Sequence, residues 1–453
     1  MRLNKRLFAV AILLICSLCA SAMANHIYVG TTELDKFKRS EHDGIFMPPP
    51  DAYSDYPGGI FAFRGDTSRQ NAAFGMADIL LNEMEVLWQV PVKDGFGPAS
   101  QPLIVKWAKE IREEMNIYDD MKYTSALREV IVSDLGGVVH FLNLKDGLPT
   151  RDAIDLGTAS NGNISLYPSA TNAILSVDES LFELFTQKKL PLSIDGMTSP
   201  IFDRTSDNMI VTGTDGALYT IKLNSEFDYH AMSVTAEPDT AIRFVPENGP
   251  SATAPGNVAM VSSSAFYTDK HGIMNIVDAN TMVGIFSFPL DSRAHIALDF
   301  EFEDENTWAI YAADSSCVYR IDGATIHTYW KTPYANVIGF IPAPIVGQQS
   351  IGDRVIFTLG NAVTAFDKKA GAIVWQTPLD NPCQSSPVAV YNEGGEAFIL
   401  QADESGVLYM LAGQSGAVLQ SLPLAGDVEA SPAVYNDVLV IGTSKYLYGI
   451  LLK

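Results

Sequence analysis

The sequence predicts an all-β protein, an eight-bladed β-propeller made of four-stranded antiparallel blades. A pattern repeats at intervals of about 45 residues from residue 137 onward, with a turn residue followed by alternating apolar positions. The turn residues are Gly137, Ser180, Gly216, Gly272, Ser316, Asn361, Gly406 and Lys445. A repeat of this length with strand-type alternation is typical of propellers, whose blades cannot bury both faces alone.

The repeat at residues 355–379 shows how one blade is expected to form. Turn residues separate three runs of strand length, which are Val355–Leu359, Ala362–Phe366 and Ala372–Thr377. An innermost strand is expected before them, near Pro344–Gly347. Ser-Pro pairs precede short apolar runs in three other repeats, at Ser199-Pro200, Ser386-Pro387 and Ser431-Pro432. Proline is tolerated there because its missing N–H falls at the first residue of the strand.

The last repeat, residues 438–453, lacks a fourth strand. The run Glu85–Val90 is nearly a duplicate of Ala372–Thr377, the outer strand of a complete repeat. We therefore expect the N-terminal strand at 85–92 to complete the last blade and close the ring, which would remove two exposed sheet edges.

The run from Ala365 to Trp375 reads Ala-x-Asp-x-x-x-Gly-x-x-x-Trp. It resembles the repeat signature of the PQQ-like (quinoprotein-type) β-propeller family, where PQQ is pyrroloquinoline quinone. The copies at 410–420 and 276–286 keep only parts of it, and Phe63-Arg64-Gly65-Asp66 resembles a segment common near the start of such chains. Over residues 57–453, the resemblance implies an eight-bladed ring like that of BamB-type propellers or quinoprotein dehydrogenases.

Residues 1–24 have the features of a secretory signal peptide, ending in the small-x-small sequence Ala22-Met23-Ala24. Its apolar run is too short to cross a bilayer, so no transmembrane segment is expected in the mature chain. We expect export by a Sec-type route to the periplasm, the cell surface or the medium. Residues 25–56 are polar and contain prolines, which predicts an arm before the propeller at 57–453.

Three segments depart from the repeat. Lys106–Leu127 has helical periodicity and interrupts the first blade, either as a solvated excursion or as a binding insertion. Pro238–Pro255 is rich in Pro, Ala, Thr and Ser, which predicts a long loop. In residues 298–305, the acids Asp299, Glu301 and Glu303 alternate with apolar residues, which predicts a solvated outer strand, with calcium binding as the alternative.

The residues that could carry chemistry form no recognisable motif. The resemblance implies an adjacent cysteine pair in a quinoprotein dehydrogenase, and the mature chain has only Cys317 and Cys383, which we expect to be separate thiols. The histidines, including His140 and His271, have no metal-ligand spacing, and Arg64-Gly65-Asp66 is expected to be structural rather than a receptor-recognition tripeptide. We therefore predict no catalytic, cofactor-binding or metal-binding residues, and neither PQQ nor calcium.

The formal net charge of −23 makes nucleic acid and anionic membrane surfaces poor partners. Two functions remain open. The first is a non-enzymatic propeller that binds an envelope protein or a cell-wall component as a scaffold, as the family resemblance implies. The alternative is a divergent quinoprotein, or another small-molecule binder, that uses the central channel.

Overall fold

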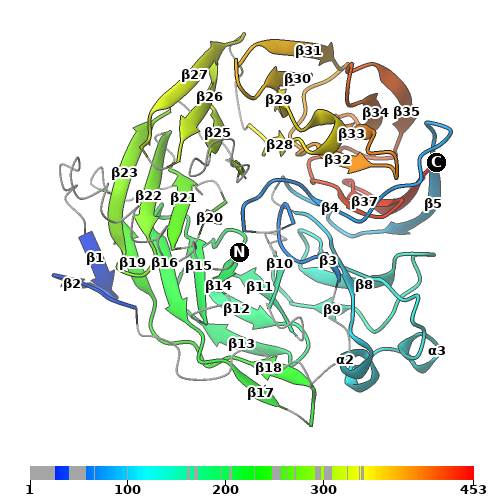
Figure 1. Ribbon diagram of the computed structural model, residues 1–453. Coiled ribbons are helices and arrows are strands. Elements are labelled where there is room, and N and C mark those ends of the chain that lie inside the picture. The colour runs from blue at the N-terminus through cyan, green and yellow to red at the C-terminus, as the bar shows by residue number, and fades with distance from the viewer. Residues whose placement is uncertain are drawn as a thin grey trace, which may run out of the picture.

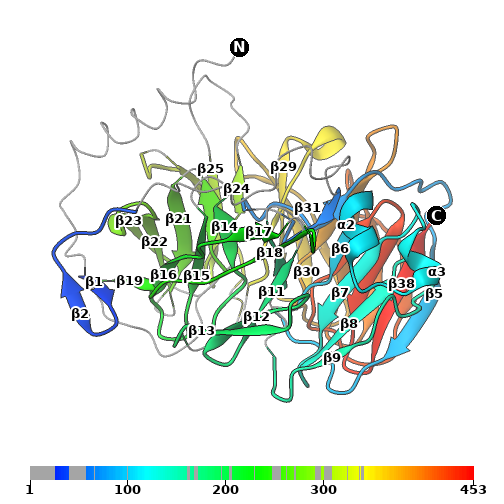
Figure 2. The ribbon, with the colours of Figure 1, turned by 90° about the horizontal axis from the view of Figure 1, so that it is seen from below.

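Eight blades stand round a ring, which confirms the predicted fold class (Figure 1). The computed structural model describes residues 26–39, 58–65, 67–98, 100–160, 164–167, 172–194, 196–203, 207–228, 230–246, 257–261, 263–269, 272–290, 297–299, 309–323, 325–335, 337 and 341–453. Seen from the side, the blades stand next to one another with their strands crossing the thickness of the ring (Figure 2).

Five blades consist of four antiparallel strands each, which follow one another from the axis to the rim. Blade 2 has β10 (Ile164–Leu166), β11 (Ala173–Val177), β12 (Ser180–Glu183) and β13 (Lys188–Pro191). Blade 4 has β20 (Ala259–Val261), β21 (Ser264–Thr268), β22 (Ile273–Asp278) and β23 (Val283–Pro289). Blade 5 has β24 (Ala297–Asp299), β25 (Ala309–Ala313), β26 (Cys317–Asp322) and β27 (Thr328–Pro333). Blade 6 has β28 (Ile345–Val346), β29 (Arg354–Leu359), β30 (Ala362–Asp367) and β31 (Ile373–Pro378), and blade 7 has β32 (Val388–Tyr391), β33 (Ala397–Ala402), β34 (Val407–Ala412) and β35 (Val418–Pro423).

The other three blades carry additional strands. Blade 1 has β3 (Gly58–Ile60), β6 (Leu103–Lys106), β7 (Glu129–Ser133), β8 (Val138–Asn143) and β9 (Ile154–Asp155). Blade 3 has β14 (Ile201–Asp203), β15 (Asn208–Thr212), β16 (Leu218–Lys222), β19 (Ile242–Val245), β1 (His26–Val29) and β2 (Thr32–Leu34). Blade 8 has β4 (Ala73–Phe74), β36 (Ala433–Tyr435), β37 (Val438–Gly442), β38 (Tyr446–Leu452) and β5 (Met84–Pro91).

The strands of blade 6 confirm the interpretation of one repeat. β29 and β30 meet at the turn of Gly360 and Asn361, and Gly360 has φ of +63°, which glycine adopts without strain. The expected inner strand is β28, and the three Ser-Pro pairs precede β14, β32 and β36. Both faces of each blade are apolar, because each packs against a neighbouring blade.

Tryptophans of the outer strands join neighbouring blades. Each indole N–H donates to a main-chain carbonyl of the next blade, at 2.8 to 3.0 Å. The indole ring lies against the glycine that follows this carbonyl residue by three positions in the chain. The sets are Trp88 with Leu144 and Gly147, Trp330 with Lys368 and Gly371, and Trp375 with Gly413 and Gly416. The glycine and tryptophan of the repeat signature therefore act between blades rather than within one.

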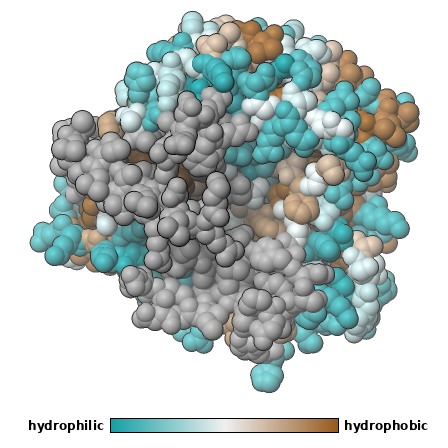
Figure 3. Space-filling view, in the orientation of Figure 1, coloured by the Kyte–Doolittle hydropathy of each residue, from teal (hydrophilic) through white to brown (hydrophobic). Residues whose placement is uncertain are grey.

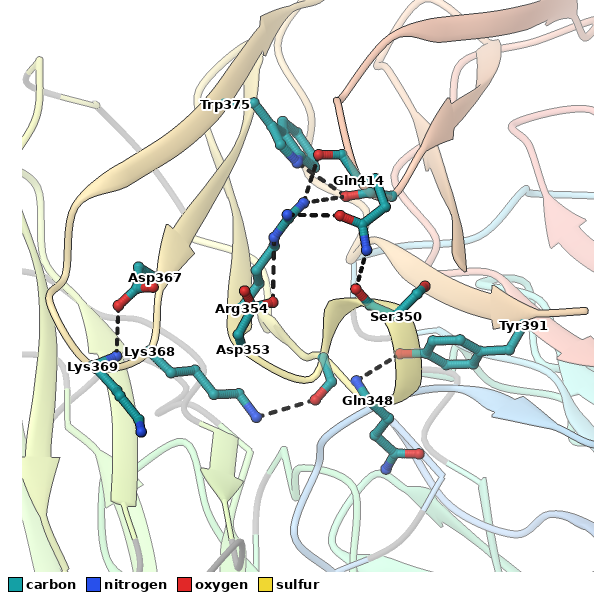
Figure 4. A network of polar contacts seen from close by, with 12 residues as sticks. Gln348, Ser350, Asp353, Arg354, Asp367, Lys368, Lys369, Trp375, Tyr391 and Gln414 are labelled. Carbon is teal, nitrogen blue, oxygen red and sulfur yellow. Dashed lines mark hydrogen bonds and ion pairs between the residues drawn. The ribbon is translucent and has the colours of Figure 1, made fainter. Parts of the chain in front are cut away.

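Polar contacts reinforce the joint between blades 6 and 7 (Figure 4). The Arg354 guanidinium donates to the Gly413 and Gln414 carbonyls at 3.1 and 2.6 Å and to the Gln414 side chain at 2.8 Å. Gln414 donates in turn to the Ser350 carbonyl, which belongs to the 3-10 helix η2 (Gln349–Ile351) of blade 6. These groups bond to one another, so the network holds the two blades together.

Replacement of Gly416 by alanine is expected to lower the free energy of unfolding by about 2–4 kcal/mol. The strain of a left-handed backbone adds to the steric clash of the new Cβ with a neighbouring ring. Gly416 has φ of +71°, and a Cβ there would lie 2.4 Å from the Trp375 ring. Gly157→Ala is the matched control, since Gly157 has φ of +69° but open space around it, and should cost about 1 kcal/mol. Urea denaturation measures both variants, and equal losses would contradict the packing role of Gly416.

The N-terminal strand closes the ring as predicted. β5 pairs antiparallel with β38, from Met84 opposite Leu452 to Pro91 opposite Tyr446. Trp88 then links this completed blade to blade 1 through the Leu144 carbonyl. The first and last blades are thus held together by both a strand pairing and a side-chain contact.

Blade 3 corrects one prediction. The long loop expected over Pro238–Pro255 is wrong for residues 242–245, which form β19 and pair with β16. The hairpin of β17 (Glu226–Asp228) and β18 (Ser233–Thr235) accounts for much of the extra length of this repeat. The hairpin β1–β2, from the segment predicted as an arm, pairs with β19 and covers the outer edge of the blade. Residues 247–256 lie outside the described residues.

The helical insertion lies between β6 and β7 as expected, with α2 (Lys109–Glu114) and α3 (Asp119–Lys122). The prediction that this insertion is a solvated excursion is wrong, however, because Trp107, Ile111 and other apolar residues of the insertion are buried against blades 1 and 2. The Trp107 indole donates to Glu129 at 2.7 Å, and Arg151 binds the same buried carboxylate at 3.0 and 2.7 Å. Helical spacing identified the helices but not the surface that they cover.

The acidic segment also differs from its prediction. Residues 297–299 form β24, which pairs with β25 as the innermost strand of blade 5 and lies beside β20 and β28, so the expected outer strand is wrong. Alternation of apolar and acidic residues separates two faces of a strand but does not place the strand within its sheet. Residues 300–308 lie outside the described residues.

Candidate functional site

The middle of the ring contains residues 61–65 and 67–72, called the axial segment below, which lie between β3 and β4 in the chain (Figure 1). Its main chain and side chains bond to the inner parts of several blades. The Phe61 carbonyl accepts from Leu166 at 2.8 Å in blade 2, and the Thr67 carbonyl accepts from Met260 at 2.7 Å in blade 4. The Asn71 side chain exchanges two bonds with Ala389 of blade 7, at 2.7 and 3.0 Å.

Arg64 is fully buried and ties the axial segment to blades 6 and 7. Its guanidinium donates to the carbonyls of Pro387 at 2.6 Å, Pro344 at 2.9 Å and Gln70 at 3.2 Å. Pro344 and Pro387 precede the inner strands β28 and β32, so their carbonyls face the axis. Burial lowers the pKa of Arg64 to about 9, since the charged form is removed from water.

Arg69 plays the same part for blades 3 and 4. It donates from Nε to the Val258 carbonyl at 2.9 Å and from a terminal nitrogen to the Ser199 carbonyl at 3.1 Å. Sequence analysis missed Arg69, although an irregular stretch with two arginines in an acid-rich chain is a usable signal. Arg64 is buried, as a structural role of its tripeptide requires, while Asp66 lies outside the described residues.

Gly65 allows the axial segment to fold back on itself. Its φ is +89°, and a Cβ at this position would lie 2.4 Å from the Asn71 carbonyl oxygen. Only glycine fits both the backbone conformation and the space. The close approach brings Arg64 and Asn71, which both bind blade 7, to the same side of the axis.

Many acidic side chains cap hairpin turns. In five blades an aspartate accepts main-chain N–H groups with one oxygen and, with the other, approaches a polar group on the following strand. The pairs are Asp134 with His140, Asp215 with Tyr219, Asp269 with Asn275, Asp314 with Tyr319 and Asp403 with Tyr409. His140 lies in the strand β8, as expected, and its ring nitrogen is 3.2 Å from the Asp134 carboxylate. Burial raises the pKa of Asp134, but its hydrogen bonds with His140 and Val138 outweigh burial and leave that pKa below its usual value.

Among the residues that the structure describes, no three His, Cys, Asp or Glu side chains gather closely enough to bind a metal ion. His271 and most of the acidic segment lie outside those residues. Cys317 and Cys383 are both buried and free, which confirms separate thiols. The described part of the chain also contains no helix of the length and apolarity that a membrane span requires.

Glu183 gives a pH-dependent prediction. Its buried carboxylate accepts from Ala236 N–H at 2.8 Å and Thr186 O–H at 2.5 Å, yet burial raises its pKa above the ordinary 4.5. The wild type should therefore lose stability as the pH rises from about 4.5 through the raised pKa. Over that range the Glu183 carboxyl ionises more readily in the unfolded chain than in its buried site in the folded protein. Glu183→Gln lacks this loss, so its melting temperature relative to wild type should rise over that range. A constant difference at all pH values would contradict the prediction.

The comparisons with known proteins agree with this fold. Residues 359–450 match the family model described as outer membrane protein assembly factor BamB, and no curated protein sequence matches the chain. BamB from Moraxella catarrhalis aligns with a TM-score of 0.54 at 14% identity, covering 82% of this chain and 100% of its own. Quinohemoprotein alcohol dehydrogenase from Comamonas testosteroni aligns with a TM-score of 0.62 at 11% identity, covering 87% of this chain and 80% of its own.

A europium-containing methanol dehydrogenase aligns with a TM-score of 0.58 at 11% identity, covering 87% of this chain and 98% of its own. At such identities, the likeness establishes the fold alone. Residues 359–450 thus resemble repeats of the BamB-type family, and the whole chain shares the eight-bladed propeller fold of these structures.

Proposed function

We propose that the chain is a non-enzymatic, exported β-propeller that acts as a protein-binding scaffold in the cell envelope. The observation that carries the proposal is the axial segment, because Arg64 and Arg69 bond the inner ends of blades 3, 4, 6 and 7. A ring held at its centre presents its loops and rim as a preorganised surface. The likeness to BamB and the expected signal peptide at residues 1–24 support an envelope location.

The second candidate is a divergent quinoprotein, which the likeness to the two dehydrogenases favours. A quinone in the central channel would have to share the axis with the axial segment. Displacing Arg64 would remove the guanidinium from the two buried carbonyls of Pro344 and Pro387, each at a cost of about 1–3 kcal/mol. This cost favours the scaffold over a quinone bound at the level of Arg64.

The test incubates the exported protein with PQQ and calcium and follows thermal unfolding together with dye-linked alcohol oxidation. We expect neither a change in melting temperature nor turnover. A melting temperature that rises with PQQ, together with turnover, would replace the scaffold function by the dehydrogenase. A partner retained in stoichiometric amounts from envelope extracts would support the scaffold.

A further inference from the structure

The link between β4 and β5 exposes several large apolar side chains close together in the chain. The exposed fractions are 53% for Met76, 77% for Leu80 and 64% for Leu81. Leu80 is the most exposed large apolar side chain in the described part of the chain. Figure 3 shows hydrophobic surface on the right-hand rim, where Figure 1 places this link. Single exposed apolar residues are ordinary, but large apolar side chains exposed next to one another, as at Leu80 and Leu81, are typical of an interaction surface.

The backbone of this link is fixed, so the apolar side chains are held outward rather than carried on a free loop. Ala77 and Ile79 are buried in the core between blades 7 and 8. The Ala77 N–H donates to the Tyr391 carbonyl at 2.9 Å, and the Leu81 and Glu83 N–H groups donate to the Lys453 carbonyl at 3.1 Å. Binding to such a surface costs little ordering of the backbone.

The charges around this surface are acidic. Asp78, Glu83 and Glu85 are exposed within the same stretch of chain, and Lys453 forms an ion pair with Glu85. A second copy of the chain, or an anionic lipid surface, would place like charges opposite one another. An apolar surface bordered by carboxylates instead complements apolar side chains that are accompanied by Lys or Arg.

We propose that Met76, Leu80 and Leu81 form a docking ridge for a protein segment that combines apolar side chains with lysine or arginine. The inference rests on the proposed scaffold function and gives that scaffold a binding surface and a class of partner. Leu80 and Leu81 supply the apolar anchors, and Asp78 and Glu83 set the preference for cations.

The test measures fluorescence anisotropy of two labelled amphipathic helical peptides, one of leucine and lysine and one of leucine and glutamate, against the exported protein. We expect the lysine peptide alone to bind, and L80S/L81S to weaken it about ten-fold. The matched control is I373S/V374S, a consecutive pair on β31 with exposed fractions of 46% and 44%, which should change binding less than about two-fold. D78K/E83K should reverse the preference between the peptides.

Equal binding of the two peptides, or equal losses from the two serine pairs, would overturn the docking ridge. Binding to phosphatidylglycerol vesicles that L80S/L81S abolishes would assign the surface to lipid, and a dimer that L80S/L81S abolishes would assign it to a second copy. An envelope partner that binds wild type and L80S/L81S equally would contradict the docking ridge while leaving the scaffold function intact. PQQ-dependent turnover would remove the scaffold function itself.

Discussion

Arg64→Met is expected to destabilise the protein by about 3 kcal/mol or more, because two buried carbonyls lose the guanidinium that donates to them. These are the carbonyls of Pro344 and Pro387, which bond to the fully buried Arg64 where water does not replace the guanidinium. Removing a buried charge recovers part of this loss, since burial already lowers the pKa of Arg64. The hydrogen bonds outweigh that gain, because a charged donor to a carbonyl contributes about 1.5–3 kcal/mol per bond.

Arg64→Lys separates charge from geometry. Lysine keeps the cation but has a compact ammonium in place of a planar fork, and it cannot reach carbonyls on blades 6 and 7 together. The free energy of unfolding of Arg64→Lys, measured by urea denaturation, should lie between that of the wild type and that of Arg64→Met. Arg128→Met is the control, because Arg128 is half-buried and bonds to Tyr435 and nearby carbonyls, and should cost about 1 kcal/mol. If Arg64→Met cost no more than this control, the axial segment would not hold the ring.

The blades and the closure of the ring were predictable because each leaves a local signal in the chain. Alternating apolar residues between turns define the strands, and the Trp-Gln pair that Glu85–Val90 and Ala372–Thr377 share, each after two apolar residues, indicates that both are outer strands. A tryptophan that packs on a glycine of the next blade imposes the same short sequence wherever the joint recurs. Trp88 and Trp375 carry that sequence at opposite ends of the chain.

The axial segment was not predictable in this way. Arg64 and Arg69 bind main-chain carbonyls, which any residue supplies, so nothing in the sequence of blades 3, 4, 6 and 7 identifies their partner. The pairing of β1 with β19 joins residues far apart in the chain and occurs once, so no repeat reveals it. The helical insertion showed its period, but its buried face follows from contacts with blade 2 that periodicity does not encode.

Trp88→Ala is expected to open the ring at the contact between its last and first blades. Trp88 is 7% exposed and packs among residues of blades 1 and 8, so its truncation should cost about 3–5 kcal/mol. Trp375→Ala removes the same contact between blades 6 and 7 and should cost a similar amount. The two variants differ in consequence, because a covalent loop connects blades 6 and 7 directly, whereas blade 8 meets blade 1 through β5.

Hydrogen exchange distinguishes the two variants. In Trp88→Ala, amides of β5 and β38 should exchange faster than those of β30 and β31, and Trp375→Ala should show the reverse. A disulfide across the closing pair, made by Glu85→Cys with Leu451→Cys, should restore about 2–4 kcal/mol to Trp88→Ala when oxidised and nothing when reduced. Uniform exchange in both variants would mean that the ring unfolds as one unit, and closure by β5 would then be no weaker than any other joint.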